Sequence, residues 1–375
     1  MLLTMAFLRT IHPHLEEAAR LVCNWRRVLG SITLPLILPG ILLSAILVFL
    51  ITLGEFGVPA FFRYEVFPVE SFTQFSAFLD FRAATASAVP LLLITSGLLG
   101  LERAFLREKT YQLRPVPPGG SDREIRLSKA RTWSFVGVTF LCLVFVVLPL
   151  LALVAQSLSL KAYGEALALG ADSLLRSLIY ATVGASLLTV LGFFLGYLIE
   201  TRSLPFWRSI DTLTIFLFAL PSTVIAIGLI TLWNRPSLAF LYGTPAMIVL
   251  GYVAQYTALT RRITVSTLGQ IPRSMEEAAQ IAGGRWLRRL GLIIAPLSKR
   301  GLIGGWLIAY IFCLRDLGVS ILVYPPGYDT LPVRTFTLMA NGSVELIAAL
   351  CVLMIVVTLL PLGLLGIALR KGAQG

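Results

Sequence analysis

The sequence has little charge, few histidines and few cysteines, and each shortage excludes a class of protein. Only 13% of the 375 residues are charged while 57% are hydrophobic, a composition that cannot be folded around one water-soluble core. The two histidines and four cysteines show no metal-site or disulfide spacing. The sequence also has no Gly-x-x-x-x-Gly-Lys-Ser/Thr loop for ATP phosphates and no His-Glu-x-x-His. We therefore predict a membrane protein that is not an enzyme and holds no cofactor or metal.

Long apolar runs, by contrast, are abundant. At ~1.5 Å per helical residue each run is long enough to cross a hydrocarbon layer of about 30 Å. Such runs form helices, because every backbone polar group must find a partner without water. The sequence predicts an all-α, polytopic transmembrane protein with about eight spans. They lie at 33–53, 84–101, 134–155, 177–199, 211–233, 244–260, 301–322 and 345–368.

Lysine and arginine collect on one side of these spans. The segments 1–32, 102–132, 200–209, 261–300 and 369–375 hold 24 of the 31 basic residues. By the positive-inside rule these segments, and with them both termini, are expected to be cytoplasmic. The net charge of +12 then reflects this topology and attraction to anionic membrane lipid. Nucleic-acid binding is not expected, since no soluble basic domain is present to carry it.

One motif recurs in these basic segments. Glu277-Ala278-Ala279 is followed by Gly283 and then by Pro296. Near the start of the chain, Glu17-Ala18-Ala19 is followed by Pro35. Recurrence of a motif at similar spacing indicates an internal repeat.

The sequence after each motif repeats as well. Glu55 and Asp316 each fall 20 residues after the proline of their copy. Further on, Val69–Thr73 corresponds to Val333–Thr337, with three extra residues in the second copy. The chain is therefore predicted to hold two homologous modules.

The two predicted modules are unequal. Residues 1–101 contain one motif loop and two spans, residues 102–132 form a polar linker, and residues 133–375 contain six spans with the loop at about 261–300. If the duplication was once complete, about four helices are missing before Met1. We expect an N-terminally truncated copy, a fragmentary gene product or a chain completed by a neighbouring polypeptide.

The second motif loop is predicted to contain a short helix. Ser274 is suited to be its N-cap, with Glu277 at the third helical position, as in a capping box. Gly283 permits a close turn, and beyond it Trp286 and Leu287 alternate with arginines in an amphipathic pattern. Such a helix can dock in a groove of a soluble partner or lie on the lipid surface.

The two loops resemble the cytoplasmic loop of permease subunits of binding-protein-dependent ABC importers. That loop carries Glu-Ala-Ala, three residues, Gly, nine residues, Ile, any residue and Leu-Pro. The second copy keeps this register at Ile293, with Ala295 in place of the leucine. In the first copy Cys23 occupies the glycine position and Ile32-Thr33-Leu34-Pro35 arrives one residue early.

The tandem arrangement resembles the fused permeases of ferric-iron importers, with thiamine and phosphonate importers as close relatives. Leu314–Leu317 and Tyr324–Arg334 share in this likeness. The resemblance implies a permease in a bacterial cytoplasmic membrane that imports ferric iron with an extracytoplasmic substrate-binding protein. It also implies that helices around Glu17 to Gly30 and Glu277 to Leu290 couple to ABC ATPase subunits, one copy for each loop.

Three charged residues are candidates for an outer gate. Arg315 and Asp316 are predicted in the outer third of the seventh span, and Glu55 occupies the matching place in the first module. Charges at membrane depth are functional candidates by default. The alternative is that Arg315 and Asp316 sit at the interface or pair with each other. Two other classes also stay open at this point, an ion-coupled secondary transporter and a non-transporting membrane scaffold.

Overall fold

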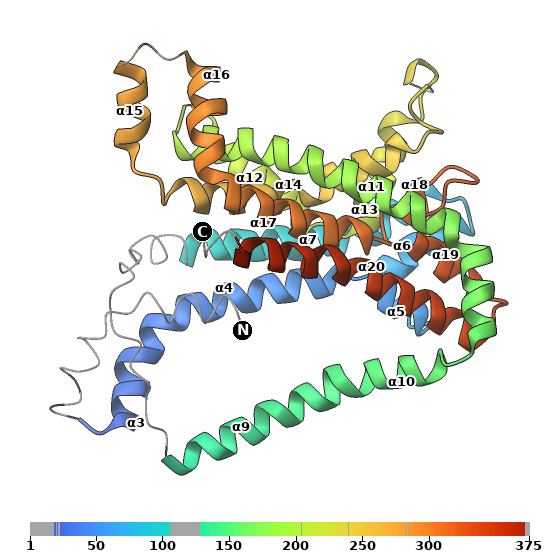
Figure 1. Ribbon diagram of the computed structural model, residues 1–375. Coiled ribbons are helices and arrows are strands. Elements are labelled where there is room, and N and C mark those ends of the chain that lie inside the picture. Colours follow the sequence, from blue (N-terminus) through green and yellow to red (C-terminus); the bar gives the residue numbers. More distant parts are fainter. Residues whose placement is uncertain are drawn as a thin grey trace. The chain divides into compact units, whose positions relative to one another are not determined.

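A computed structural model describes residues 19, 21, 23–105, 128–203, 205–238, 240–281, 283 and 285–371 (Figure 1). Within these ranges the regular structure is entirely helical, which confirms the predicted all-α class. The chain divides into two compact units. Unit 1 comprises residues 1–54 and 89–143, and unit 2 comprises residues 55–88 and 144–375. Residues 55–88 of the predicted first module thus pack with the second, while 106–127 of the predicted linker lie outside the described residues.

Unit 1 is built from a few long apolar helices. Its first helical stretch runs without a break through α3 (Trp25–Val28), η1 (Leu29–Thr33) and α4 (Leu34–Leu53). It also contains the later part of α7 (Phe81–Phe105), and α9 (Ser128–Cys142). Prolines lie inside α4 and α7, at Pro39 and Pro90.

Unit 2 holds the helices that follow. Its early elements are α5 (Gly57–Phe61), α6 (Phe67–Ser76) and the first turns of α7. Its middle elements begin with η2 (Leu143–Val147), whose first residue is the last residue of unit 1. They continue with α10 (Leu148–Gln156), α11 (Leu160–Glu200), α12 (Trp207–Ala219), α13 (Ser222–Trp233), η3 (Pro236–Leu238) and α14 (Ala246–Leu268). The last elements are α15 (Arg273–Ile281), α16 (Trp286–Arg289), η4 (Leu290–Ile294), α17 (Ala295–Leu314), α18 (Ser320–Val323), α19 (Leu331–Leu338) and α20 (Val344–Lys371).

The core of unit 2 forms where α11 packs against α14 and α17. Small residues make the α11–α14 approach close. A Cβ added to Gly196 would lie 2.8 Å from the side chain of Thr264, and one added to Gly192 would lie 2.8 Å from the backbone nitrogen of Arg261. Small residues at helix crossings are typical of membrane bundles, where packing and not water exclusion drives association.

Six described helices are long and apolar enough to cross a membrane, or seven if α12 and α13 together form one span. The span predicted over 211–233 is broken, because α12 and α13 meet at Leu220-Pro221 with a bend of 110°. α14 has 23 residues but carries buried Arg261, which pairs with Asp211 of α12. The count of eight spans stays a prediction.

Other predicted boundaries also changed. α14 continues to Leu268, so the connection predicted at about 261–300 begins later and is shorter. The span predicted over 301–322 ends at Leu314, which puts Arg315 and Asp316 after the helix and not inside it. Pro272 precedes a helix that starts at Arg273, one residue before the predicted cap at Ser274.

The helices recur along the chain at the spacing of the sequence repeat. α16, η4 and α17 have the same lengths as α3, η1 and α4, and each begins 261 residues after its counterpart (25 and 286, 29 and 290, 34 and 295). After the three-residue insertion, α6 and α19 begin 264 residues apart (67 and 331). Shared sequence positions therefore form shared helices, down to the π-helical turn before α4 and α17.

Candidate functional site

The second motif loop forms a helical hairpin at one end of unit 2, made of α15 and α16 (Figure 1). Gly283 has φ of +81°, in the left-handed region that glycine adopts without strain, and it follows the end of α15 closely. The chain then turns into α16, which continues through η4 into α17. Pro296 lies in the first turn of α17, where the missing N–H costs little.

The hairpin is fixed to the bundle on one side. The Tyr197 hydroxyl, near the end of α11, donates a hydrogen bond to Glu276 Oε1. Arg289 Nη1 donates to Gln280 Oε1 at 2.8 Å and joins the two arms. Below them Leu290 is buried together with Phe193, Tyr197, Leu268 and Ile294. The hairpin is thus held as a unit by its base.

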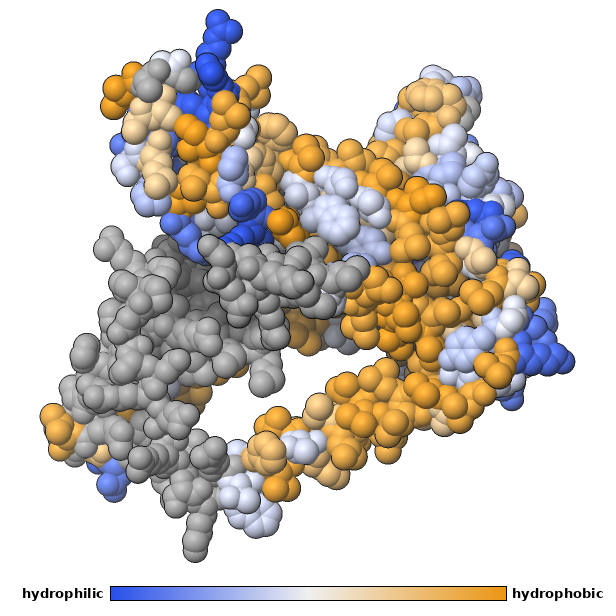
Figure 2. Space-filling model, viewed as in Figure 1, coloured by the Kyte–Doolittle hydropathy of each residue, from blue (hydrophilic) through white to orange (hydrophobic). Residues whose placement is uncertain are grey.

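The other side of the hairpin is open. Glu277 and Ala278 are exposed and Ala279 is half-buried. Large apolar side chains are exposed beside them, namely Met275, Ile281, Trp286 and Leu287. Figure 2 shows this end as a mixture of hydrophobic and hydrophilic residues. Exposed apolar groups interleaved with charge are typical of a surface that meets a partner or a lipid headgroup layer.

The first motif loop lies largely outside the described residues. Glu17 and Ala18 are among those that the structure does not describe, while Ala19 is helical and half-buried. The structure therefore places one complete copy of the motif.

A second group of candidate residues lies where α17 ends, at the opposite end of unit 2. Asp316 is 4% exposed. Its Oδ1 accepts a hydrogen bond from the Tyr256 hydroxyl at 2.7 Å, and its Oδ2 accepts from the backbone N–H and the hydroxyl of Ser320 at 2.9 and 2.8 Å. The Tyr252 and Ser320 hydroxyls are 3.1 Å apart. We call Tyr252, Tyr256, Asp316 and Ser320 the junction cluster; it ties α14, the end of α17 and α18 together.

The other two predicted gate residues have separate partners. Arg315 is exposed, with its guanidinium 4.7 Å from the centre of the Phe312 ring. Glu55 Oε1 accepts a hydrogen bond from the backbone N–H of Gly57 at 3.1 Å, so it caps the start of α5. Arg315 and Asp316 thus have different neighbours, so the alternative in which the two pair with each other is not the arrangement found.

The two repeats meet in an apolar cluster beside the junction cluster. Phe56 is buried with Leu317 and Val333, and the Phe56 ring lies 5.0 Å from Phe72 and 6.1 Å from Phe336. These residues are repeat counterparts, since Phe56 corresponds to Leu317 and Phe72 to Phe336. Equivalent segments of the two modules therefore contact each other within unit 2.

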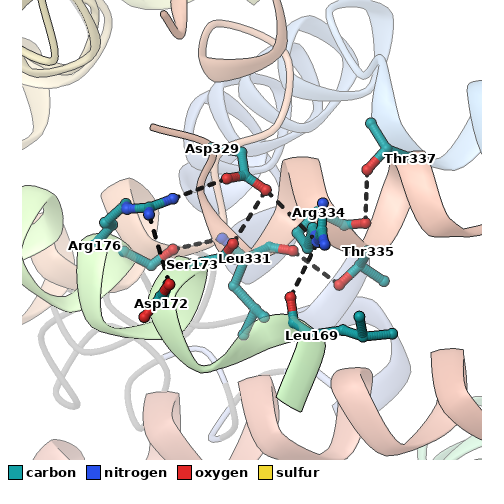
Figure 3. A network of polar contacts seen from close by, with 10 residues as sticks. Leu169, Asp172, Ser173, Arg176, Asp329, Leu331, Arg334, Thr335 and Thr337 are labelled. Carbon is teal, nitrogen blue, oxygen red and sulfur yellow. Dashed lines mark hydrogen bonds and ion pairs between the residues drawn. The ribbon is translucent and has the colours of Figure 1, made fainter. Parts of the chain in front are cut away.

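Sequence reasoning missed a network of ionic and hydrogen-bond contacts between α11 and the loop before α19 (Figure 3). We call this network, which joins Ser173 and Arg176 to Asp329 and Leu169 to Arg334, the clasp. Asp329 accepts a hydrogen bond from Arg176 Nη1 at 3.0 Å and another from Ser173 Oγ at 3.1 Å. Arg334 Nε donates to the Leu169 carbonyl at 3.1 Å. The acidic residue Asp329 in Tyr324–Arg334 could have drawn attention to this loop. Nothing in the sequence, however, indicates that α11 extends far enough to contact it.

Across the described ranges, no group of three or more His, Cys, Asp or Glu side chains could hold a metal ion. The exposed motif hairpin and the buried junction cluster lie at the two ends of α16–α17.

Comparison with known proteins decides what kind of protein carries this hairpin. Residues 188–372, which include the hairpin and the junction cluster, match the family described as the binding-protein-dependent transport system inner membrane component. These residues form a permease domain of this family. The resemblance to ABC importer permeases is thereby confirmed, and the family is one of transport proteins and not of enzymes.

Curated relatives extend the likeness beyond this domain. A putative ferric transport system permease of Haemophilus influenzae is 24% identical over 349 residues, covering 88% of this chain and 54% of the relative. A ferric transport system permease of Actinobacillus pleuropneumoniae is 23% identical over 342 residues, covering 86% and 49%. A putative 2-aminoethylphosphonate transport system permease of Salmonella paratyphi A is 26% identical over 142 residues, covering 38% and 53%. The chain spans about half the length of these relatives.

Proposed function

We propose that this chain is the transmembrane permease component of an ATP-driven ABC import system. It would form part of the translocation path and couple to a separate ATPase through its motif loops. The observation that carries the proposal is the α15–α16 hairpin, because it presents Glu277 and Ala278 outward while Glu276 fixes it to α11. The family to which residues 188–372 belong supports the same function.

The hairpin continues directly into a long helix, so it could transmit a displacement along that helix. Residues 286–314 form a single helical stretch of 29 residues, which is about 43 Å long at 1.5 Å per residue. Its first turn belongs to the hairpin, and Asp316 follows its last turn. A rigid displacement of α15 by an ATPase would therefore reach the junction cluster. Glu55, Arg315 and Asp316 remain our candidates for the outer gate on this ground.

Ferric iron is the proposed solute. Two relatives that match most of this chain are named as ferric permeases. The alternatives are thiamine, a phosphonate or another small solute, and one relative is named for 2-aminoethylphosphonate. Uptake of radioactive ferric iron and of labelled 2-aminoethylphosphonate by the same cells distinguishes them.

The proposal also fixes location and partners. The chain would lie in the bacterial inner membrane with both termini and both motif loops cytoplasmic, as the basic residues indicate. Glu17-Ala18-Ala19 and Glu277-Ala278-Ala279 would each seat in one of two ATPase subunits. An extracytoplasmic substrate-binding protein would deliver the solute. We keep 1–101, 102–132 and 133–375 as the proposed first module, linker and second module.

Charge reversal on the exposed face of α15 tests the coupling. Glu277→Arg is expected to lower the amount of ATPase that co-purifies with the chain by roughly tenfold, as a reversed charge in a docked interface does. Glu165→Arg makes the same chemical change on an exposed residue of α11 far along the chain and is the control. A complex that retains its ATPase in the Glu277→Arg variant contradicts the proposal. Ion-coupled uptake without any ATPase would indicate a secondary transporter, and no uptake of any tested solute would indicate a scaffold.

A further inference from the structure

Basic and aromatic side chains gather where α11 is connected to α12. The connection, residues 201–206, joins one candidate membrane span to the start of the next. A short connection between two spans lies at the level of the lipid headgroups. Arg202, Phe206 and Arg208 are exposed there, and Trp207 is half-buried.

Arg202 occupies a backbone position that favours glycine. Its φ is +51°, in the left-handed region. The Arg202 N–H donates to the Ile199 carbonyl at 3.2 Å, and the Ser203 N–H donates to the Leu198 carbonyl at 3.2 Å. These are the two hydrogen bonds that close a helix at a left-handed residue. Glycine would make this turn without strain, so the backbone gives no reason for an arginine here.

The side chain of Arg202 gives such a reason. Its guanidinium lies 5.3 Å from the centre of a Trp207 ring, and the Arg208 guanidinium lies 5.3 Å from a Trp207 ring as well. Neither cation forms an ion pair with another residue that the structure describes. A guanidinium that stacks on a ring uses its face, so the N–H groups on its edge stay available for the oxygens of a phosphate.

We propose that Arg202 and Arg208, held on Trp207, bind the phosphate of an anionic phospholipid. The location identifies the ligand, because lipid phosphate is the anion of the headgroup layer in which this connection lies. Phe206, which is 71% exposed, would contact the acyl chains beside it. The inference rests on the proposed membrane location, and it goes beyond the coupling function because it holds for any transported solute.

Quenching of tryptophan fluorescence by brominated lipid tests the site. The chain is reconstituted in phosphatidylcholine bilayers that contain rising fractions of brominated phosphatidylglycerol or brominated phosphatidylcholine, and the signal of the Trp207→Phe variant is subtracted. Each surface arginine strengthens the attraction of anionic lipid by about fivefold. Trp207 should therefore be quenched at a clearly lower fraction of phosphatidylglycerol than of phosphatidylcholine. Equal quenching by the two lipids overturns the proposal, and no quenching by either contradicts the membrane location itself.

Arg202→Gly separates lipid binding from a structural role. Glycine fits φ of +51°, so the midpoint of thermal unfolding should not fall, while the preference for phosphatidylglycerol should fall about fivefold. Arg208→Gln removes the second cation and should lower the preference by a similar factor.

Arg63→Gly is the matched control. Arg63 is also exposed, with φ of +54°, but its guanidinium has no ring contact with a described residue. The preference should stay unchanged in this variant. An unchanged preference in both Arg202→Gly and Arg208→Gln, or an equal fall in Arg63→Gly, overturns the proposal.

Two further measurements distinguish other ligands of these arginines. Inorganic phosphate should not reverse the quenching of Trp207 more than chloride of the same ionic strength does; a specific reversal would assign the site to a soluble phosphate. Arg202→Gly should also keep the ATPase that co-purifies with the chain. Loss of the ATPase with an unchanged lipid preference would place Arg202 in the ATPase interface and overturn the lipid site, while the coupling proposal would stand.

Discussion

The two ends of α16–α17 differ in how their polar groups are used. At the junction cluster, Asp316 is 4% exposed and accepts hydrogen bonds from Tyr256 and Ser320. At the hairpin, Glu276 is tied to Tyr197 while its neighbour Glu277 is exposed. The first acid holds helices of the chain together, and the second is left free for contact. Substitution should therefore affect stability at one end and association at the other.

The largest loss of stability is expected at the junction cluster. Asp316→Ala leaves the Tyr256 hydroxyl and the Ser320 N–H buried without their acceptor. Each lost bond of this kind costs about 1–3 kcal/mol, so we expect the two together to cost roughly 2–6 kcal/mol. Thermal unfolding in detergent measures it. Asp316→Asn keeps an oxygen acceptor and should lose less stability. Equal and small effects of both substitutions on unfolding would contradict the claim that the junction cluster, unlike the hairpin, holds the helices together.

A smaller loss is expected at the α11–α14 crossing. A Cβ at Gly192 would lie 2.6 Å from Thr260 Cβ and 2.8 Å from the backbone nitrogen of Arg261. Overpacking of this kind costs about 1–3 kcal/mol, so Gly192→Ala should lower the midpoint of thermal unfolding. Gly164→Ala on the same helix meets nothing within 4 Å and is the matched control. If both alanines behave alike, the close crossing is not a source of stability.

The clasp on the loop before α19 should matter less. Arg176→Ala removes the 3.0 Å contact to Asp329 in a pair whose side chains are 28% and 17% exposed. Part of the contact is screened by solvent, so a loss of about 1 kcal/mol is expected. Asp172→Ala, on a side chain that is 88% exposed, should have no measurable effect on unfolding. A larger effect of Asp172→Ala would mean that the clasp is arranged differently.

Backbone strain in the hairpin should not reach the bundle. Gly283→Ala places a side chain at φ of +81°, at a cost of about 1 kcal/mol. The cost falls on the turn between α15 and α16, so ATPase association should weaken several-fold while the unfolding midpoint falls by less than it does with Gly192→Ala. Gly291→Ala, where nothing lies within 4 Å, is the control. A fall in the unfolding midpoint equal to that of Gly192→Ala would show that the hairpin is part of the core.

Sequence reasoning found what depends on composition and repetition. Apolar runs and the spacing from Pro35 to Glu55 and from Pro296 to Asp316 gave the class and the repeat, because both are written along the chain. It failed where a contact joins distant elements. The break at Leu220-Pro221 and the hydrogen bond from Tyr256 to Asp316 depend on packing that no local pattern encodes.

The candidate site residues divide in the same way, into those identified by a local motif and those that depend on contacts between distant elements. Glu277 and Gly283 could be identified from their motif, and the structure places both in an exposed hairpin. Glu276, which anchors that hairpin, was passed over because Tyr197 lies 79 residues away. The clasp at Asp329 was missed for the same reason, since its partners on α11 are 153 and 156 residues distant.

The central claim is that α15 is a cytoplasmic docking helix for a separate ATPase. The most direct test is labelling of Ala278→Cys by a membrane-impermeant maleimide, in a chain whose Cys23, Cys142, Cys313 and Cys351 are replaced. We expect labelling in inside-out vesicles stripped of ATPase, protection when the ATPase is added back, and no labelling in intact cells; Glu165→Cys should show the opposite sidedness. Labelling of Ala278→Cys in intact cells, or equal labelling with and without the ATPase, would contradict the account.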